Sequence, residues 1–433
     1  MAIAFLASGC ATYADRLNDA AWAASAGNYG GAVADVNVLL DVSSSAELPD
    51  QWSGDRPLAA LERGSLQQAL GEYTDSARDL SAAEERLELL DISTDPVGTL
   101  GSYIYSDSLK TYRTPPSERL ALNPINLLNY LAEGNFDGAA VEARRFQVMR
   151  EYLVSRNIDS SQPATLGAYL AGVVFEQRGE GDRALRYYEE ALAEGPLESL
   201  NGPIRRLART NPYRGPRIDD VLSQRKAPPR DDSPAGELLV VLSLGRVPHK
   251  VPARIPVGAA VGIAGTWVSG NIDWLKYGAA KVVVYPELVD TPSVLGAVEV
   301  RVDGTPVPVE ELTDLGTAVR REYEEAKPKI IAAALTRMAA RGAVAEGIRA
   351  GGRQQSADLG DVLSILFESA LVALDRPDTR SWTMMPDRVL VTRIPLTPGQ
   401  HTVDVDLGAG VVRTVSAEIP TRGVVAVVIT EPR

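Results

Sequence analysis

The sequence predicts an α+β protein of two domains: an N-terminal α-helical solenoid over residues 10–210, and a C-terminal β-sandwich over 237–433 with a helical insertion at about 314–375. Three observations predict this. Helical periodicity and glycine turns recur in the first half, a stretch rich in Pro and charge interrupts them at 211–236, and short apolar runs ended by Gly or Pro fill the rest. A chain of 433 residues is also too long for one ordinary core.

The chain opens with an uncharged run that ends at its single cysteine. Small residues directly precede Cys10, which resembles a bacterial lipobox, the signal in which the Cys thiol receives diacylglycerol and the preceding peptide is removed. Leu6 lies one position farther from Cys10 than is usual. The run also lacks Lys or Arg and is short, so we expect a start codon upstream. The resemblance implies that residues 1–9 are a residual signal peptide and that Cys10 is the lipidation site, which would tether the protein to a membrane. The alternative is a buried Cys in an ordinary helix.

Four stretches of the first half share a pattern of Gly, then Asn or Glu, then usually an aromatic residue, with a small residue three positions further on. Helical sequence precedes each Gly, so the pattern predicts pairs of helices joined by a tight turn. The residues expected to shape the turns and pack the pairs are Gly27, Tyr29, Ala32, Gly71, Tyr73, Ser76, Gly134, Phe136, Ala139, Gly179, Ala184 and Tyr188. In the fourth stretch Gly181 replaces the aromatic residue, and Gly172 lies on the first helix.

This pattern resembles the tetratricopeptide repeat. The resemblance implies stacked helix pairs with a concave groove for a peptide or a partner protein. The steps between the glycines are 44, 63 and 45 residues, against ~34 in an ideal array, so we expect insertions, one of them over 94–116. A helical bundle with glycine turns is the alternative.

Residues 211–236 are rich in Pro and charge and read as a linker, where we place the domain boundary. Beyond it we expect strands in four apolar runs (ELLVVLSLG, KVPARIPVG, AVGIAGTWV and KVVVYP), a hairpin at Asp303-Gly304, and four further strands after residue 387. Ala-rich sequence over 315–348 predicts helices with a break or kink at Pro328, and 359–374 reads as another helix.

The stretch TPGQHTVDVDL resembles a turn and strand of small β-sandwich modules on bacterial envelope proteins. Pro398 and Gly399 would shape the turn, and Val403 and Val405 would face the core. His401, at the start of the strand, is expected to be structural, because a lone His near a turn seldom carries catalysis.

The stretch from Pro377, PDTRSWTMMPDRV, is the most distinctive of the chain. Together with the lipobox and the repeats, it resembles a family of bacterial lipoproteins that has no assigned reaction and pairs a tetratricopeptide-like half with a C-terminal β domain. The signature residues are Asp378, Thr379, Arg380, Ser381, Trp382 and Pro386. We expect Asp378 and Thr379 to cap a turn, Arg380 to pair with an acid or a carbonyl, and Trp382 to anchor a core. This stretch is either a structural corner or an edge that binds a partner.

Composition excludes several classes of function. A net charge of −13 disfavours binding of nucleic acid, and also adsorption to anionic lipid by charge alone. One Cys and two His do not make a usual zinc site, and no nucleophile-elbow, Walker or zinc-protease motif is present. We therefore expect no metal, no cofactor and no catalytic residues.

The function expected from these residues is a non-enzymatic scaffold. The protein would be anchored through Cys10 at the periplasmic face of the outer membrane, since Ala11 is not the Asp that commonly retains lipoproteins at the inner membrane, and it would bind an unidentified envelope protein. The alternative is an envelope enzyme, or a module that binds glycan or peptidoglycan, with its site in the β domain or between the two halves.

Overall fold

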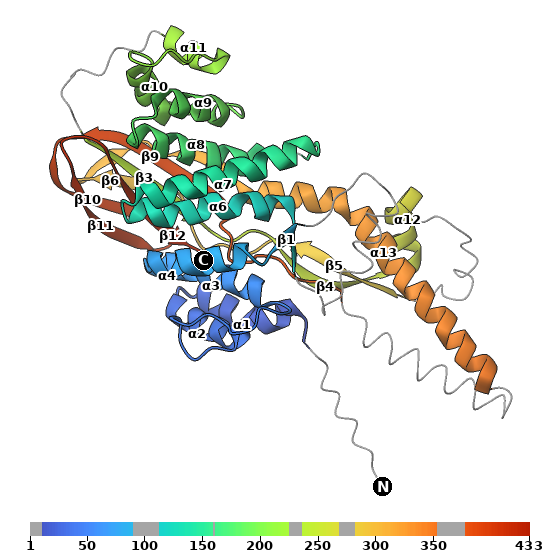
Figure 1. The fold of residues 1–433 in the computed structure, drawn as a ribbon. Coiled ribbons are helices and arrows are strands. Elements are labelled where there is room, and N and C mark those ends of the chain that lie inside the picture. Colours follow the sequence, from blue (N-terminus) through green and yellow to red (C-terminus); the bar gives the residue numbers. More distant parts are fainter. Residues whose placement is uncertain (1–10, 90–111, 159–160, 225–235, 268–281, 353–376) are drawn as a thin grey trace.

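A computed structural model describes residues 11–89, 112–158, 161–224, 236–267, 282–352 and 377–433 (Figure 1). The chain is a mixed α+β protein, with helices through its N-terminal part and sheets in its C-terminal part. Cys10, residues 1–9 and the helix expected over 359–374 lie outside the described residues.

The N-terminal helices form four antiparallel pairs. Each pair is joined by a glycine in the left-handed region, with φ of +75° at Gly27, +78° at Gly71, +67° at Gly134 and +76° at Gly179. All four glycine turns expected from the sequence are therefore confirmed as turns between helices. The paired helices are α1 (Tyr13–Ser25) with α2 (Tyr29–Leu40), α3 (Arg56–Leu70) with α4 (Tyr73–Glu84), α6 (Pro116–Ala132) with α7 (Phe136–Ser155), and α8 (Ser161–Gln177) with α9 (Gly181–Ala191).

Four of the residues expected to pack the pairs lie in the interior. Ala32, Ala139, Ala184 and Tyr188 are almost fully buried. A Cβ added to Gly172 would lie 2.3 Å from the Tyr188 ring, so a residue without a side chain is what lets α8 and α9 approach closely here.

Short elements join the pairs. Strands β1 (Glu88–Leu89) and β2 (Arg113–Thr114) pair in parallel and bring together the two ends of the expected insertion. After α9 come η1 (Glu198–Leu200), α10 (Asn201–Leu207) and α11 (Pro216–Ser223). Helix α11 lies within the expected linker, yet its Ile218 and Val221 are buried against the helical core. The Pro- and charge-rich stretch is thus partly helical and packed.

Two sheets dominate the C-terminal part. One has the strand order β12-β3-β9-β8, in which β3 and β12 are parallel and the other neighbours antiparallel; the other has the order β11-β10-β6-β7 and is antiparallel. The strands are β3 (Gly236–Leu244), β6 (Glu299–Val302), β7 (Thr305–Val307), β8 (Glu310–Asp314), β9 (Arg388–Leu396), β10 (Gly399–Asp406), β11 (Val412–Ile419) and β12 (Val424–Glu431). The hairpin expected at Asp303-Gly304 joins β6 to β7, and both residues have positive φ.

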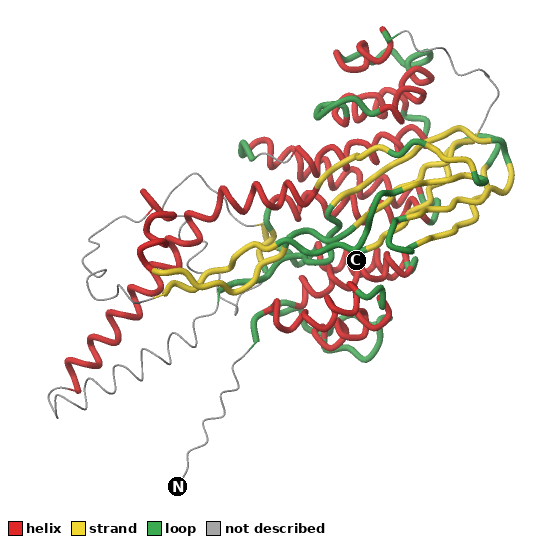
Figure 2. The backbone as a smooth tube through the Cα atoms, turned by 180° about the vertical axis from the view of Figure 1, so that it is seen from behind, coloured by secondary structure: helices red, strands yellow, loops and turns green. Residues whose placement is uncertain are grey.

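The first sheet is buried on both faces. Leu239 and Val241 of β3 belong to one apolar cluster with the N-terminal helices, whereas Leu238 and Val240, which alternate with them, belong to a second cluster with the other sheet. Alternation along a strand sends successive side chains to opposite faces. The described chain therefore has three layers, namely helices, the β3 sheet and the β10 sheet (Figures 1 and 2).

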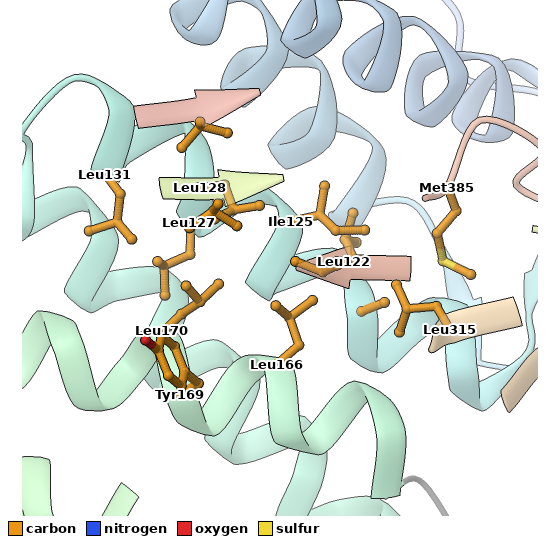
Figure 3. Close-up of a cluster of buried hydrophobic side chains, with 14 of the residues drawn as sticks. Leu122, Ile125, Leu127, Leu128, Leu131, Leu166, Tyr169, Leu170, Leu315 and Met385 are labelled. Carbon is orange, nitrogen blue, oxygen red and sulfur yellow. The ribbon is translucent and has the colours of Figure 1, made fainter. Parts of the chain in front are cut away.

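The helix-facing cluster is continuous across the two halves of the sequence. Figure 3 shows leucines of α6 and α8 facing Leu315 and Met385 from the C-terminal half. One side of the helical layer is thus covered by the chain's own sheet.

A third group of elements extends away from the layers (Figures 1 and 2). We call it the arm: β4 (His249–Pro256), α12 (Val257–Ala264), η2 (Gly265–Trp267), β5 (Val282–Val289) and the outer part of α13 (Leu315–Gly352) from Tyr323 onwards. Strands β4 and β5 pair only with each other among the described strands. The arm has its own apolar cluster, which includes Ala260, Tyr285 and Ile331.

The structure of the arm corrects one expectation and narrows another. The run AVGIAGTWV was expected as a strand, but its described residues, 260–267, lie in α12 and η2, because Ala260 and Ala264 fall one helical turn apart and both pack toward α13. Of the break or kink predicted at Pro328, the break is absent, since α13 is one helix from Leu315 to Gly352 with Pro328 inside it.

Candidate functional site

The segment Pro377–Pro386, which contains the signature residues, lies where the helices meet the β3 sheet. We call this segment the junction segment. Trp382 is fully buried, and its Nε1 donates a hydrogen bond of 3.0 Å to Ser65 Oγ on α3. Met384 and Met385 join the same apolar cluster, and Pro386 is buried. The junction segment therefore ties the strand β9 to the helical layer through its side chains.

Two buried glutamates from the helices hold the backbone of the junction segment. The amides of Thr383 and Met384 donate to the two carboxyl oxygens of Glu62, at 2.8 and 2.7 Å. The amide of Trp382 donates to Glu118 Oε1 at 3.1 Å. Three successive amides that no strand partners are thus satisfied by side chains from α3 and α6, as buried backbone donors require.

Burial changes the acidity of these groups. Desolvation raises the pKa of Glu62 to about 8, although the amides of Met384 and Thr383 oppose the rise. Desolvation likewise raises the pKa of Glu118, which also accepts a hydrogen bond of 2.5 Å from Tyr112 Oη. A third carboxyl, Glu322 of α13, accepts from the amide of Ser117 at 3.0 Å, and desolvation raises its pKa to about 7.

Two cations lie among these carboxyls. Lys250 donates through Nζ to the carbonyl of Arg380 at 3.2 Å, and its charge opposes the raised pKa values of Glu118 and Glu322. Arg246 donates to Ser25 Oγ at 2.6 Å, and burial lowers the pKa of its guanidinium. The glutamates and cations compensate one another at the place where the two halves of the sequence meet.

The other signature residues lie at the edge of the same region. Asp378 accepts hydrogen bonds from the backbone amide of Arg380 at 3.1 Å and from its guanidinium at 2.7 Å, and Thr379 Oγ1 accepts from the amide of Ala14 at 3.2 Å. The guanidinium of Arg380 also lies 3.4 Å from Asp55. Ser381 Oγ lies 3.5 Å from the amide nitrogen of Lys250.

A cavity of about 590 Å³ opens beside this edge, a volume within the usual range for small-molecule sites. It lies between the first helices and the junction segment, so both halves of the sequence line it. Arginine and aspartate side chains supply most of its polar groups. The lining residues are Ala11, Thr12, Tyr13, Arg16, Leu39, Ser53, Gly54, Asp55, Arg56, Pro377, Asp378, Thr379 and Arg380.

A second polar cluster connects α8 and α9 to the sheet. Arg393 of β9 is buried and bonds through Nε to Glu237 at 2.8 Å, through Nη2 to Glu176 at 3.0 Å, and through Nη1 to Tyr188 Oη at 3.0 Å. Burial alone would raise the pKa of Glu176, but Arg393 and Arg206 outweigh it and lower that pKa. Tyr188, expected as a packing residue, therefore also contributes a hydroxyl to this cluster.

The two histidines lie apart from the junction carboxyls. His401 bridges Asp303 (2.7 Å from Nδ1) and the carbonyl of Thr397 (2.8 Å from Nε2), so it ties the β10 strand to the hairpin turn, and Val403 and Val405 are buried as expected. His249 Nδ1 lies 2.9 Å from Thr291 Oγ1.

The residues that sequence reasoning missed are the buried glutamates. A signal exists in the helical pattern, because Glu62 shares a helix face with Leu58 and Leu66, and a carboxylate on an apolar face must find a partner. The partner itself, a turn more than 300 residues further along the chain, has no local signal.

Among the described residues, no group of three or more His, Cys, Asp or Glu side chains is placed to hold a metal ion. Within those same ranges, no helix is both long and apolar enough to cross a bilayer. No protein-family model, curated protein or solved structure matches the chain.

Proposed function

We propose that this protein is a bacterial lipoprotein, anchored through Cys10 at the periplasmic face of the outer membrane, that acts as a scaffold for another envelope protein. The sequence before Cys10 supports the anchor. The four glycine turns support a tetratricopeptide-like stack of helix pairs, and the two facing sheets support a β-sandwich.

The partner surface we propose is the outer face of α7. The observation that carries it is a stripe of exposed apolar residues: Val141, Val148 and Tyr152 are 42%, 68% and 42% exposed, and their spacing places them on one side of the helix. The side of the helical layer that faces the β3 sheet is filled by the chain itself, so an outer face is what remains for a partner.

The chemistry of the stripe favours an acidic, amphipathic helix as the partner segment. Exposed Arg144 and Arg145 lie between Val141 and Val148, and the Arg156 guanidinium lies over the Tyr152 ring at 5.3 Å. An apolar row flanked by arginines complements a helix with an apolar row and acidic flanks.

A photo-crosslinking residue placed at Val148 in the full-length protein in cells tests this proposal. It should give one discrete crosslinked protein. In pull-downs from membranes, the Val148→Asp variant should no longer recover that protein. The control variant Val412→Asp, at an exposed valine of β11, should still recover it. Equal recovery with both variants would contradict the α7 surface. Cys10→Ser should release the protein from membranes, and unchanged retention would contradict the anchor.

The cavity supports a second candidate, a site for a glycan or peptidoglycan fragment between the two halves. Its paired carboxylates and guanidiniums present both acceptors and donors, which is what sugar hydroxyl groups require. Titration calorimetry with soluble peptidoglycan fragments should show binding that Asp378→Asn weakens and Asp35→Asn, on the exposed side of α2, does not. Absence of binding to the unsubstituted protein would reject this candidate.

A further inference from the structure

The arm contains a helix whose exposed side has no polar side chain. From Ile255 to Trp267 the sequence has no charged residue. Val257, Ala260 and Ala264 of α12 are buried in the arm cluster, while Gly258, Gly262 and Ile263 are exposed, Ile263 by 39%. A helix at a water-exposed surface ordinarily carries polar residues on its outer side. Helix α12 is therefore apolar toward both the arm and the solvent.

Basic residues lie beside this helix. Arg254, on the outer side of β4, is exposed just before α12 begins. Lys329 of α13 places its Nζ 4.9 Å from the centre of the Trp267 ring. From Tyr323, where the arm begins, to its end, α13 contains five basic and three acidic residues, and Lys327 is paired with Glu324 at 3.3 Å. In a chain with a net charge of −13, this is a local reversal of sign, so the rest of the molecule is more acidic than the average indicates.

We propose that the arm binds the surface of an anionic lipid bilayer, with α12 against the boundary between headgroups and acyl chains and the basic residues beside it against lipid phosphates. An uncharged helix face beside basic side chains is the arrangement that interfacial segments use. The acidic remainder of the molecule would be repelled by the same surface, which orients the arm toward it. The net charge of the whole chain disfavours adsorption to anionic lipid, but that value is an average over two regions of opposite sign.

The chemistry distinguishes this partner from two others. A nucleic acid offers phosphates but no apolar layer for α12. A second copy of the arm offers an apolar face, but it would bring the cations of the two arms together. The inference goes beyond the proposed scaffold function and does not require acylation of Cys10.

The test uses the full chain with Cys10→Ser, so that no lipid anchor contributes. Co-sedimentation is measured with vesicles of equal parts phosphatidylcholine and phosphatidylglycerol, and with vesicles of phosphatidylcholine alone. We expect binding to the anionic vesicles only. The triple variant Arg254→Gln, Lys327→Gln, Lys329→Gln should bind at least about tenfold more weakly, since each basic residue near an anionic surface contributes a gain of roughly fivefold. Raising the ionic strength should also release the unsubstituted chain.

Matched variants keep the test specific. The triple variant Arg214→Gln, Arg301→Gln, Arg422→Gln removes the same charge from exposed positions off the arm and should bind as before. Ile263→Asp should weaken binding, and Val412→Asp should not. The inference is overturned by equal binding to neutral and anionic vesicles, by no binding to either, by equal losses from the two triple variants, by unchanged binding of Ile263→Asp, or by arm-dependent binding to a DNA duplex without binding to vesicles.

Discussion

The junction and the arm solve the same problem, packing helices against strands, with opposite chemistry. At the interface between the N-terminal helices and the β3 sheet, which we call the junction, carboxyl groups and guanidiniums are buried and bonded to partners far away in sequence, as Glu62 and Arg393 show. In the described residues of the arm, from Tyr323 outward and over β4, α12 and β5, no charged side chain is among the buried ones. The junction is therefore held by buried hydrogen bonds and ion pairs as well as by its apolar core, whereas the arm is held by apolar packing.

This difference predicts how each region responds to change. Removing one member of a buried polar cluster leaves its partner unsatisfied, so damage at the junction should spread across both halves of the sequence. A change in the arm removes contacts of the arm's own cluster and should stay local.

The largest expected effect is at Trp382. Trp382→Ala should lower the free energy of unfolding by about 3–5 kcal/mol, because it empties a large buried site and leaves Ser65 without its donor. Trp267→Ala in the arm should cost no more than about 2 kcal/mol, since that ring is only partly buried. Urea unfolding of the two variants measures the contrast. Equal losses of unfolding free energy in the two variants would contradict the difference between the junction and the arm.

A matched pair of core truncations should separate the two regions. Leu128→Ala in α6 and Ile331→Ala in α13 each empty a fully buried site, at a cost of about 2–5 kcal/mol to the region concerned. Hydrogen exchange should show faster exchange through helices and the β3 sheet for Leu128→Ala, but only in the arm for Ile331→Ala. Faster exchange of the body in Ile331→Ala would show that the arm is not a separate cluster.

These contrasts also mark what the sequence predicts. Gly27, Gly71, Gly134 and Gly179 identify the helix turns because a left-handed residue after a helix is a local requirement. Asp303-Gly304 identifies a hairpin for the same reason. The run that contains Ala260 reads as a strand but is helical, because a short apolar run has the same composition in either structure and its packing against α13 decides between them.

The contacts of the junction segment cannot be predicted from the local sequence. The stretch around Trp382 stands out in the sequence, and its anchoring role was anticipated, but its contact with Glu62 and Glu118 depends on where the fold brings residues hundreds of positions apart. Two domains separated at 211–236 remain our prediction for how the chain divides into folding units. The two halves of the sequence nevertheless share one apolar cluster in the structure.

The buried carboxyls give the junction a pH dependence. Since the folded pKa of Glu62, about 8, lies above its ordinary value of 4.5, the folded state holds more protons between these values and stability should fall as the pH rises through that window. Glu62→Gln should reduce this slope and leave the part that the raised pKa values of Glu118 and Glu322 contribute. It should also cost about 1–3 kcal/mol at neutral pH, because a side-chain NH₂ replaces one acceptor of a backbone amide.

Urea midpoints measured from about pH 4.5 to about pH 8 check this expectation. Glu85→Gln, at an exposed carboxyl at the end of α4, is the control and should leave both the slope and the midpoint as they are. A slope as steep in Glu62→Gln as in the unsubstituted protein would assign the pH dependence to other groups.

The smallest effect is expected at an exposed ionic contact. The Asp303 carboxylate raises the pKa of His401, so this contact stabilises the folded state at low pH and loses that contribution as the pH rises past the folded pKa. His401→Gln should lower the urea midpoint slightly at acidic pH and leave it unchanged at alkaline pH. A loss as large as that of Glu62→Gln would contradict the distinction between buried and exposed charges.

The central claim is that the N-terminal helices and the β3 sheet unfold as one unit around their shared core. Native-state hydrogen exchange in increasing urea tests it most directly. We predict that amides of α3, α6, β3 and β9 converge on a single free energy of opening. The amides of α12 should exchange through an opening reaction of lower free energy. Two separate free energies, one for the helices and another for the sheet, would contradict the claim.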